Sequence, residues 1–175
     1  MHGSTIRVYP QWGFGGTAIK QRSQNGATFR ELDFLRKVQE SPVLPRIFAP
    51  GYIEFGGTAH IIMQAYRELS QENFNYDAAR EDLLRAVREL HSQGICHNNV
   101  TPDNVMFNPG TLRFILIGLG NAALKGHSVL YANTKFVLPH LRGQQAPAVY
   151  GADEYGVDQV LDYWKQSFSS PDGSA

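Results

Sequence analysis

The alternation of apolar and polar residues in the first third of the chain predicts two β-hairpins. In the first, Ile6–Tyr9 and Thr17–Lys20 are the strands, and a glycine-rich stretch between them is the turn. In the second, Tyr52–Phe55 and His60–Met63 lie on either side of two glycines. Branched and aromatic residues at this spacing are typical of strands with one buried face.

Helical periodicity occurs three times along the chain. Apolar residues at 29, 32, 35 and 38 share one helix face, and Pro42 and Pro45 end that helix. A second apolar stripe spans 83–90, with Asp77 as the predicted N-cap and Gly94 as the C-terminal stop. A third helix is expected over 155–164, and two short strands are expected over 104–107 and 113–117.

The order of these elements predicts an α+β fold made of a small β-rich lobe and a helical lobe. The domain covers 1–168, with about 1–65 in the small lobe, about 66–168 in the helical lobe, and 169–175 as a disordered tail. A chain of 175 residues buries roughly 70% of its unfolded surface, so this fold needs no disulfide or structural metal.

Composition and charge exclude several classes of function. Sixteen basic residues balance 16 acidic residues, which argues against binding to nucleic acid or to an acidic membrane surface. The single cysteine, Cys96, excludes an intramolecular disulfide and a cysteine-rich zinc site, and we interpret it as a small buried apolar residue. No apolar run approaches the roughly 18 residues of a membrane span, so a cytoplasmic or otherwise intracellular location is expected.

The most informative block lies between the second helix and the short strands. It is His97-Asn98-Asn99-Val100-Thr101-Pro102-Asp103-Asn104, and a later strand ends at Gly118-Leu119-Gly120. This order resembles the protein-kinase family, in which the loop has the pattern His-Arg-Asp, four residues and Asn, and the later strand ends in Asp-Phe-Gly. It is also similar to compact kinase-like proteins of filamentous fungi, whose loop has the pattern His-Asn-Asp-x-x-Pro-x-Asn.

The resemblance extends from about Gly3 to about Trp164 and implies a protein-kinase-like fold with a reduced small lobe and a shortened helical lobe. It also implies roles for single residues. Lys20 is similar to the strand lysine that holds nucleotide phosphates, and Glu31 to its helix partner. His97 is similar to a buried packing histidine of the loop, and Asp153 to the aspartate that supports the loop.

Two positions depart from the family pattern where phosphoryl transfer needs carboxylates. Asn99 occupies the position of the catalytic aspartate, and an amide cannot provide general-base help, which is worth about 10²–10⁴-fold. Gly118 occupies the position of the metal-binding aspartate and offers no side-chain oxygen to a hard cation. No catalytic residue is therefore intact, and no metal site is expected. Asp103, the only acid in the loop, is similar to a variable position that points away from the chemistry.

Lys20, Glu31 and Asn104 remain as candidates for nucleotide binding. The resemblance therefore leaves ATP, with weak or no magnesium, as the only cofactor to consider. The alternative is that Lys20 and Glu31 form only an ion pair between strand and helix. The glycines at 13, 15 and 16 are interpreted as a turn and not as a phosphate-covering loop.

The expected function is that of a pseudokinase, a catalytically degenerate domain that binds and regulates another protein, such as an active kinase or its substrate. Val129–Pro139 occupies the place of the activation segment and is either a docking surface or packed on the helical lobe. One alternative is an ATP-dependent phosphotransferase, similar to serine/threonine kinases, with unusual metal handling. Another is a domain that lost its activity without gaining a new one.

Overall fold

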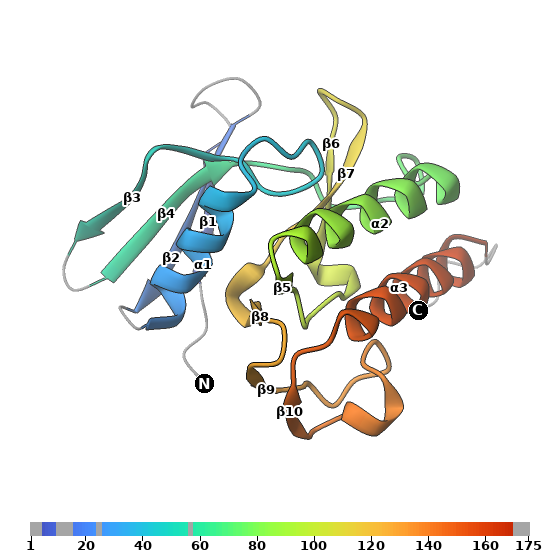
Figure 1. The fold of residues 1–175 in the computed structure, drawn as a ribbon. Coiled ribbons are helices and arrows are strands. Elements are labelled where there is room, and N and C mark those ends of the chain that lie inside the picture. The colour runs from blue at the N-terminus through green and yellow to red at the C-terminus, as the bar shows by residue number, and fades with distance from the viewer. Residues whose placement is uncertain (1–4, 10–15, 24–25, 56–57, 170–175) are drawn as a thin grey trace.

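A computed structural model of the chain describes residues 5–9, 16–23, 26–55 and 58–169 (Figure 1). Figure 1 shows a twisted sheet with one helix against it on one side of the molecule, and two long helices on the other side. The chain passes from the first part to the second once, at the end of the last strand of the sheet. The predicted division into a sheet lobe and a helical lobe is therefore visible in the element order.

The small lobe is a four-stranded antiparallel sheet in the order β1-β2-β4-β3. On β4, Ile61 and Met63 are buried while His60 and Ile62 are only half-buried, as the two-residue period of a strand requires. The buried residues join the core that α1 completes. The elements are β1 Thr5–Tyr9, β2 Thr17–Ser23, α1 Gly26–Lys37, β3 Ile47–Phe55 and β4 Thr58–Gln64.

The helical lobe consists of α2 (Tyr76–Ser92) and α3 (Tyr150–Ser169), which pack against each other. Leu83, Val87 and Leu90 form the buried stripe of α2 and belong to the same apolar core as the small lobe. Three short antiparallel strand pairs lie between the two helices in sequence. They are β5 Ile95–Cys96 with β8 Ala123–Leu124, β6 Val105–Asn108 with β7 Arg113–Leu116, and β9 Ser128–Leu130 with β10 Gln145–Pro147.

A buried carboxylate fixes the β6–β7 hairpin to α2. Asp82 accepts a hydrogen bond from the Phe114 backbone N–H at 2.9 Å and pairs with Arg113 Nη1 at 2.7 Å. A buried charge is costly unless it is partnered, and here both partners come from β7. The hairpin joins Asn104 to Gly118, so this contact also sets where those two candidate residues lie.

The predicted hairpins and helices are confirmed, with differences at their ends. The helix predicted over 155–164 is longer and starts at Tyr150, and the strand predicted from 104 starts at Val105 because Pro102–Asn104 form a short 3-10 turn. Residues 10–15, with most of the predicted glycine turn, and residues 170–175 of the predicted tail lie outside the described residues. Within the described ranges, no helix has both the length and the apolar content to cross a membrane.

The predicted N-cap of α2 is wrong. Asn75 has an extended backbone, with φ −128° and ψ 118°, and its side chain accepts the Ala78 N–H at 2.9 Å. Asp77 lies in the first turn instead. Both residue types are good caps, but only the residue just before the first turn can reach the free N–H groups. Gly94 is confirmed as the stop, since its φ of +74° follows the C-cap Gln93.

Replacing Asn75 with alanine removes the acceptor for the Ala78 N–H and should lower the free energy of unfolding by about 1 kcal/mol. Urea denaturation followed by circular dichroism measures the change. Asn75→Asp keeps an acceptor oxygen and should lose less. If Asp77→Ala lowered the free energy of unfolding as much as Asn75→Ala does, the assignment of Asn75 as the cap would be contradicted.

Candidate functional site

Lys20 on β2 and Glu31 on α1 form a buried ion pair in the small lobe. The Lys20 Nζ atom lies 2.6 Å from Glu31 Oε1, and the two side chains are 9% and 2% exposed. Lys20 shares its strand face with the buried Ala18, which belongs to the core that α1 completes. Each charge compensates the burial of the other, so the pair holds α1 against the sheet.

Asp153, in the first turn of α3, holds the loop that begins at His97. Its side chain is fully buried. One oxygen accepts the Asn98 N–H at 2.7 Å, and the other accepts the His97 N–H at 2.7 Å and the His91 ring Nε2–H at 2.9 Å. Three donors thus satisfy a carboxylate that burial would otherwise make costly.

The His97 ring connects the loop to the strand end before Gly118. Its Nε2 donates to the Ile117 carbonyl at 2.9 Å, and its Nδ1 accepts the Asn99 N–H at 3.3 Å. These two bonds need a neutral ring with the proton on Nε2. Complete burial lowers the pKa of His97, which favours the same neutral form, although the nearby Asp153 charge opposes the shift.

Asn98 has a backbone conformation that is uncommon outside glycine, with φ of +61°. Its amide Nδ2 donates to the Cys96 carbonyl at 3.1 Å and to the Asn121 carbonyl at 3.2 Å. Together with the hydrogen bond that the Asn98 N–H donates to Asp153, these contacts hold the turn between Cys96 and Asn99. The Oδ1 atom of Asn98 is buried and accepts no hydrogen bond from the described part of the chain.

Asn99, Asn104 and Gly118 meet at the end of this loop. The Asn104 side-chain Nδ2 donates to the Asn99 carbonyl at 2.8 Å, and the Ile117 N–H donates to the Asn104 carbonyl at 2.8 Å. Gly118 follows in the left-handed region, with φ of +86° and ψ of 43°. The structure therefore brings together the three sequence-predicted positions at which kinases bind metal or accept a proton.

A side chain at position 118 would collide with Asn104. A Cβ atom built on Gly118 would lie 2.8 Å from Asn104 Cγ and would overlap its Oδ1. A shift of the Asn104 side chain away from Gly118 would strain its hydrogen bond to Asn99. The carboxamide of Asn104 thus occupies the space that an aspartate at position 118 would need.

The residues at this site do not fit a magnesium ion. A magnesium site needs near-octahedral oxygen coordination, commonly with one or two carboxylates. Asn104 Oδ1 is one neutral oxygen, and Gly118 contributes none. Among the described residues, no group of three or more His, Cys, Asp or Glu side chains is placed to hold a metal ion. The side chains of Asn99 and Asn104 can donate and accept hydrogen bonds but cannot serve as a base near neutral pH.

Asp103 lies on another surface. It is exposed and lines a pocket of about 470 Å³ with Met106 and Trp164. Neither Asn99 nor Asn104 lines that pocket.

Cys96 is completely buried at the start of the loop. Burial, with a smaller contribution from the negative charge of Asp153, raises the pKa of the thiol to about 12. The thiolate is the reactive form of cysteine, so this residue is inert at neutral pH. The interpretation of Cys96 as a small buried residue is confirmed.

The segment after the site is held by its own side chains. The buried Tyr131 donates its hydroxyl hydrogen to the Pro147 carbonyl at 3.2 Å and accepts the Val149 N–H at 3.2 Å. Arg142 Nε donates to the Val137 carbonyl at 2.9 Å. Within Val129–Pro139, Tyr131 and Val137 are buried, and Leu130 is 76% exposed. The segment is therefore anchored by two buried side chains and partly open to solvent.

His91 and Tyr150 also belong to the site, although the sequence did not identify them. The His91 ring donates to Asp153 and stacks on Tyr150 with ring centroids 4.0 Å apart, and the Tyr150 hydroxyl donates to the His91 carbonyl at 2.9 Å. His91 and Asp153 are 62 positions apart, and no local pattern relates them. The only available signal was a polar residue at the end of a helix that leads into the loop.

Two known proteins that resemble the chain are kinases, although no protein-family model matches it. The chloroplastic serine/threonine-protein kinase STN7 of Arabidopsis thaliana is 37% identical over 70 residues, which are 40% of this chain and 12% of that protein. The kinase PK-1 of the Cydia pomonella granulovirus superposes with a TM-score of 0.71 at 16% identity, over 91% of this chain and 65% of that chain. The chain thus spans less than two thirds of either protein.

Cys96 should not react with the thiol reagent DTNB in the folded protein at pH 8, because its thiol is buried and protonated. In urea above the unfolding transition, one thiol per chain should react at once. Absorbance of the released thionitrobenzoate measures both rates. Rapid labelling of the folded protein would show that the thiol is accessible.

Gly118→Asp should destabilise the fold through two effects, backbone strain at positive φ and the collision with Asn104. Gly126→Asp is the matched control, because Gly126 has a φ of +85° and a Cβ atom at that position would meet no other atom within 4 Å. Strain alone costs about 1–2 kcal/mol. We expect Gly118→Asp to lose about 1–3 kcal/mol more than the control in urea denaturation.

The double variant Gly118→Asp/Asn104→Ala separates the two effects. Removing the Asn104 carboxamide should recover most of the stability that Gly118→Asp loses beyond the control. A double-mutant cycle measures this recovery as a coupling energy between positions 118 and 104. Equal losses at positions 118 and 126, with no coupling to position 104, would mean that the carboxamide does not block the site.

Proposed function

Because the chain has a protein-kinase-like fold, with a reduced β-rich lobe and a shortened helical lobe, we propose that it is a pseudokinase. In this proposal the domain does not transfer phosphate and acts by binding and regulating another protein. The partner is an active kinase or the substrate of such a kinase. By the shape of its surface, the domain would occupy the docking face of the active kinase or sequester the substrate. Either contact would keep the kinase and its substrate apart.

One observation carries the proposal, the contact of Asn104 with Asn99 and Gly118. Phosphoryl transfer depends on carboxylates that position the acceptor and hold metal ions. Here the two carboxylate positions are an amide and a glycine, and the remaining metal-ligand position donates its side-chain N–H to the loop backbone. Restoring one aspartate would not reopen the site while Asn104 occupies the space beside Gly118.

The segment Val129–Pro139 supports a binding role. In kinases that regulate their activity, such segments are often ordered by phosphorylation. Here Tyr131 and Arg142 order the segment through bonds to backbone carbonyls, and Tyr131 is too buried to be modified in the folded protein. A surface that is already ordered loses less entropy when it binds a partner.

An active ATP-dependent phosphotransferase, of the serine/threonine kinase kind, remains the second candidate. The buried pair of Lys20 and Glu31 favours it, because kinases need this pair for nucleotide phosphates. In the pseudokinase proposal the same pair attaches α1 to the sheet, and any nucleotide binds weakly and with little or no dependence on magnesium.

Thermal unfolding with ATP or ADP, with and without magnesium, distinguishes the two candidates. A ligand at a hundred times its dissociation constant adds about 2.7 kcal/mol to stability. We expect no magnesium-dependent stabilisation and no transfer of radiolabelled γ-phosphate to the chain or to a generic protein substrate. Lys20→Ala tests the nucleotide site, and Lys37→Ala, which replaces an exposed lysine at the end of α1, is the control.

Magnesium-dependent stabilisation and phosphate transfer that Lys20→Ala abolishes and Lys37→Ala retains would refute the proposal and establish the second candidate. Nucleotide could raise the unfolding temperature equally with and without magnesium, with no transfer of phosphate. That result would agree with a pseudokinase that uses nucleotide as a structural ligand.

A further inference from the structure

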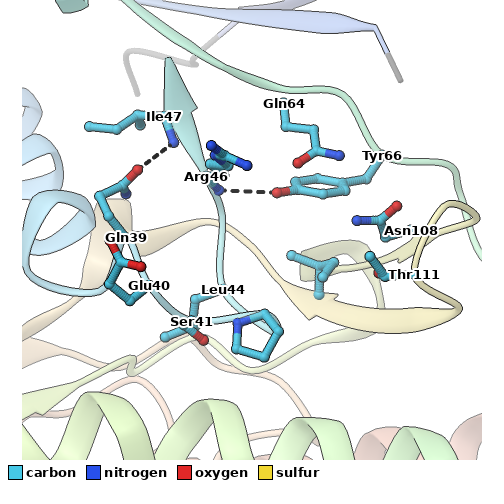
Figure 2. Close-up of a pocket in the computed structure, with 12 residues that line it drawn as sticks. Gln39, Glu40, Ser41, Leu44, Arg46, Ile47, Gln64, Tyr66, Asn108 and Thr111 are labelled. Carbon is cyan, nitrogen blue, oxygen red and sulfur yellow. Dashed lines mark hydrogen bonds between the residues drawn. The ribbon is translucent and has the colours of Figure 1, made fainter. Parts of the chain in front are cut away.

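A polar pocket of about 440 Å³ lies apart from the loop site (Figure 2). Its walls come from three parts of the chain. They are residues 39–47 after α1, Gln64 and Tyr66 where the sheet lobe leads into the helical lobe, and the β6–β7 hairpin. None of Lys20, Glu31, Asn99, Asn104 and Gly118 lines it. The pocket is therefore a separate feature that the proposed function does not use.

Side-chain hydrogen bonds hold the pocket wall at Arg46 and Ile47 from both sides. Gln39 Oε1 accepts the Ile47 N–H at 2.9 Å, and the Tyr66 hydroxyl oxygen accepts the Arg46 N–H at 3.0 Å, as the dashed lines in Figure 2 show. The Gln64 N–H donates to the Arg46 carbonyl at 2.9 Å. This wall is thus fixed before any ligand arrives.

Four oxygen acceptors of the lining are already occupied by backbone N–H groups. Besides Gln39 Oε1 and the Tyr66 oxygen, Ser41 Oγ accepts the Val43 N–H at 3.2 Å and Asn108 Oδ1 accepts the Gly110 N–H at 3.1 Å. Each of these bonds uses one lone pair of its oxygen, and Gln39 Nε2 already donates to the Leu35 and Pro45 carbonyls. The Ser41 and Tyr66 hydroxyl hydrogens and the Asn108 Nδ2 hydrogens stay available as donors within the described part of the chain. Asn108 in particular keeps both of its Nδ2 hydrogens.

The remaining polar groups of the lining add further donors. Within the described ranges, the Arg46 guanidinium and the Gln64 side-chain amide make no hydrogen bond or ion pair, and Arg46 is exposed. Burial raises the pKa of Tyr66, so its hydroxyl keeps a hydrogen to donate. Arg46, Gln64, Tyr66 and Asn108 thus present donors, one of them charged, to the same opening.

Glu40 is the only carboxylate among the described residues that line the pocket. In Figure 2 it lies on the opposite side of the pocket from Asn108 and Thr111. Its charge would oppose a second anionic group on its own side. The floor contains the buried side chains of Leu44 and Ile115, which suit an aliphatic stem.

We propose that this pocket binds one carboxylate on a short aliphatic stem, as a small organic acid or a glutamate side chain of another protein carries it. The carboxylate accepts hydrogen bonds from Arg46, Gln64, Tyr66 and Asn108, and the stem lies on Leu44 and Ile115. A guanidinium beside neutral amide donors is a common arrangement for binding carboxylates.

Titration of the ¹⁵N-labelled full chain with butyrate, followed by heteronuclear NMR, tests the proposal. We expect saturable shifts of the backbone amides of Arg46, Gln64 and Asn108. Butyramide has the same shape without the charge and should cause none. Arg46→Gln should weaken butyrate binding at least about tenfold, since a hydrogen bond to a charged group contributes about 1.5–3 kcal/mol.

Two further variants make the test specific. Arg88→Gln removes an exposed arginine of α2 that does not line the pocket, and its binding should match that of the unmodified chain. Glu40→Gln removes the opposing charge and should tighten binding. A peptide with one glutamate and blocked ends distinguishes a small organic acid from a protein as the source of the carboxylate. Tighter binding of this peptide than of butyrate would identify a protein partner.

Absence of saturable shifts with both butyrate and the peptide would overturn the proposal. So would binding that Arg46→Gln and Arg88→Gln weaken equally, or equal shifts with butyramide. None of these outcomes depends on nucleotide or on phosphate transfer, so the pocket and the pseudokinase proposal can fail independently.

Discussion

The buried carboxylate of Asp153 is the contact on which the candidate site depends. It accepts hydrogen bonds from the His97 and Asn98 backbone and from the His91 ring, so it joins α3, the loop and the end of α2. Its bond to Asn98 supports a residue with positive φ, and the turn so formed places His97 against the strand end before Gly118. Without this carboxylate, two buried backbone N–H groups would lose their acceptor, which is among the more costly changes in a protein interior.

The bonds that hold the loop end largely on backbone atoms. Asp153 accepts from the N–H groups of His97 and Asn98, and the His97 ring reaches the Ile117 carbonyl and the Asn99 N–H. Backbone groups are the same whatever the residue type. The side chain at position 99 is therefore free to change while the loop keeps its shape, and this explains how a kinase-like scaffold can coexist with an amide at that position.

Much of the fold was predictable from local pattern, because hydrophobic periodicity is a property of neighbouring residues. The alternation on β4 and the stripe of Leu83, Val87 and Leu90 on α2 each require burial of one face, and the structure buries those faces. The ends of elements were less predictable. Asn75 and Asp77 are both good N-cap types, and the choice between them depends on where the chain enters the helix.

The sequence alone predicted the three helices, the strands β1–β4, β6 and β7, the two-lobe division, and the residue types at each candidate position, including the amide at Asn99 and the glycine at Gly118. The tertiary structure alone decided what those residues touch. The bond from His91 to Asp153, the turn of the Asn104 side chain into the space beside Gly118, and the donor-lined pocket at Arg46 join residues far apart in sequence. Such contacts form only when separate elements pack together, because periodicity fixes which face a residue lies on and not which distant residue meets it.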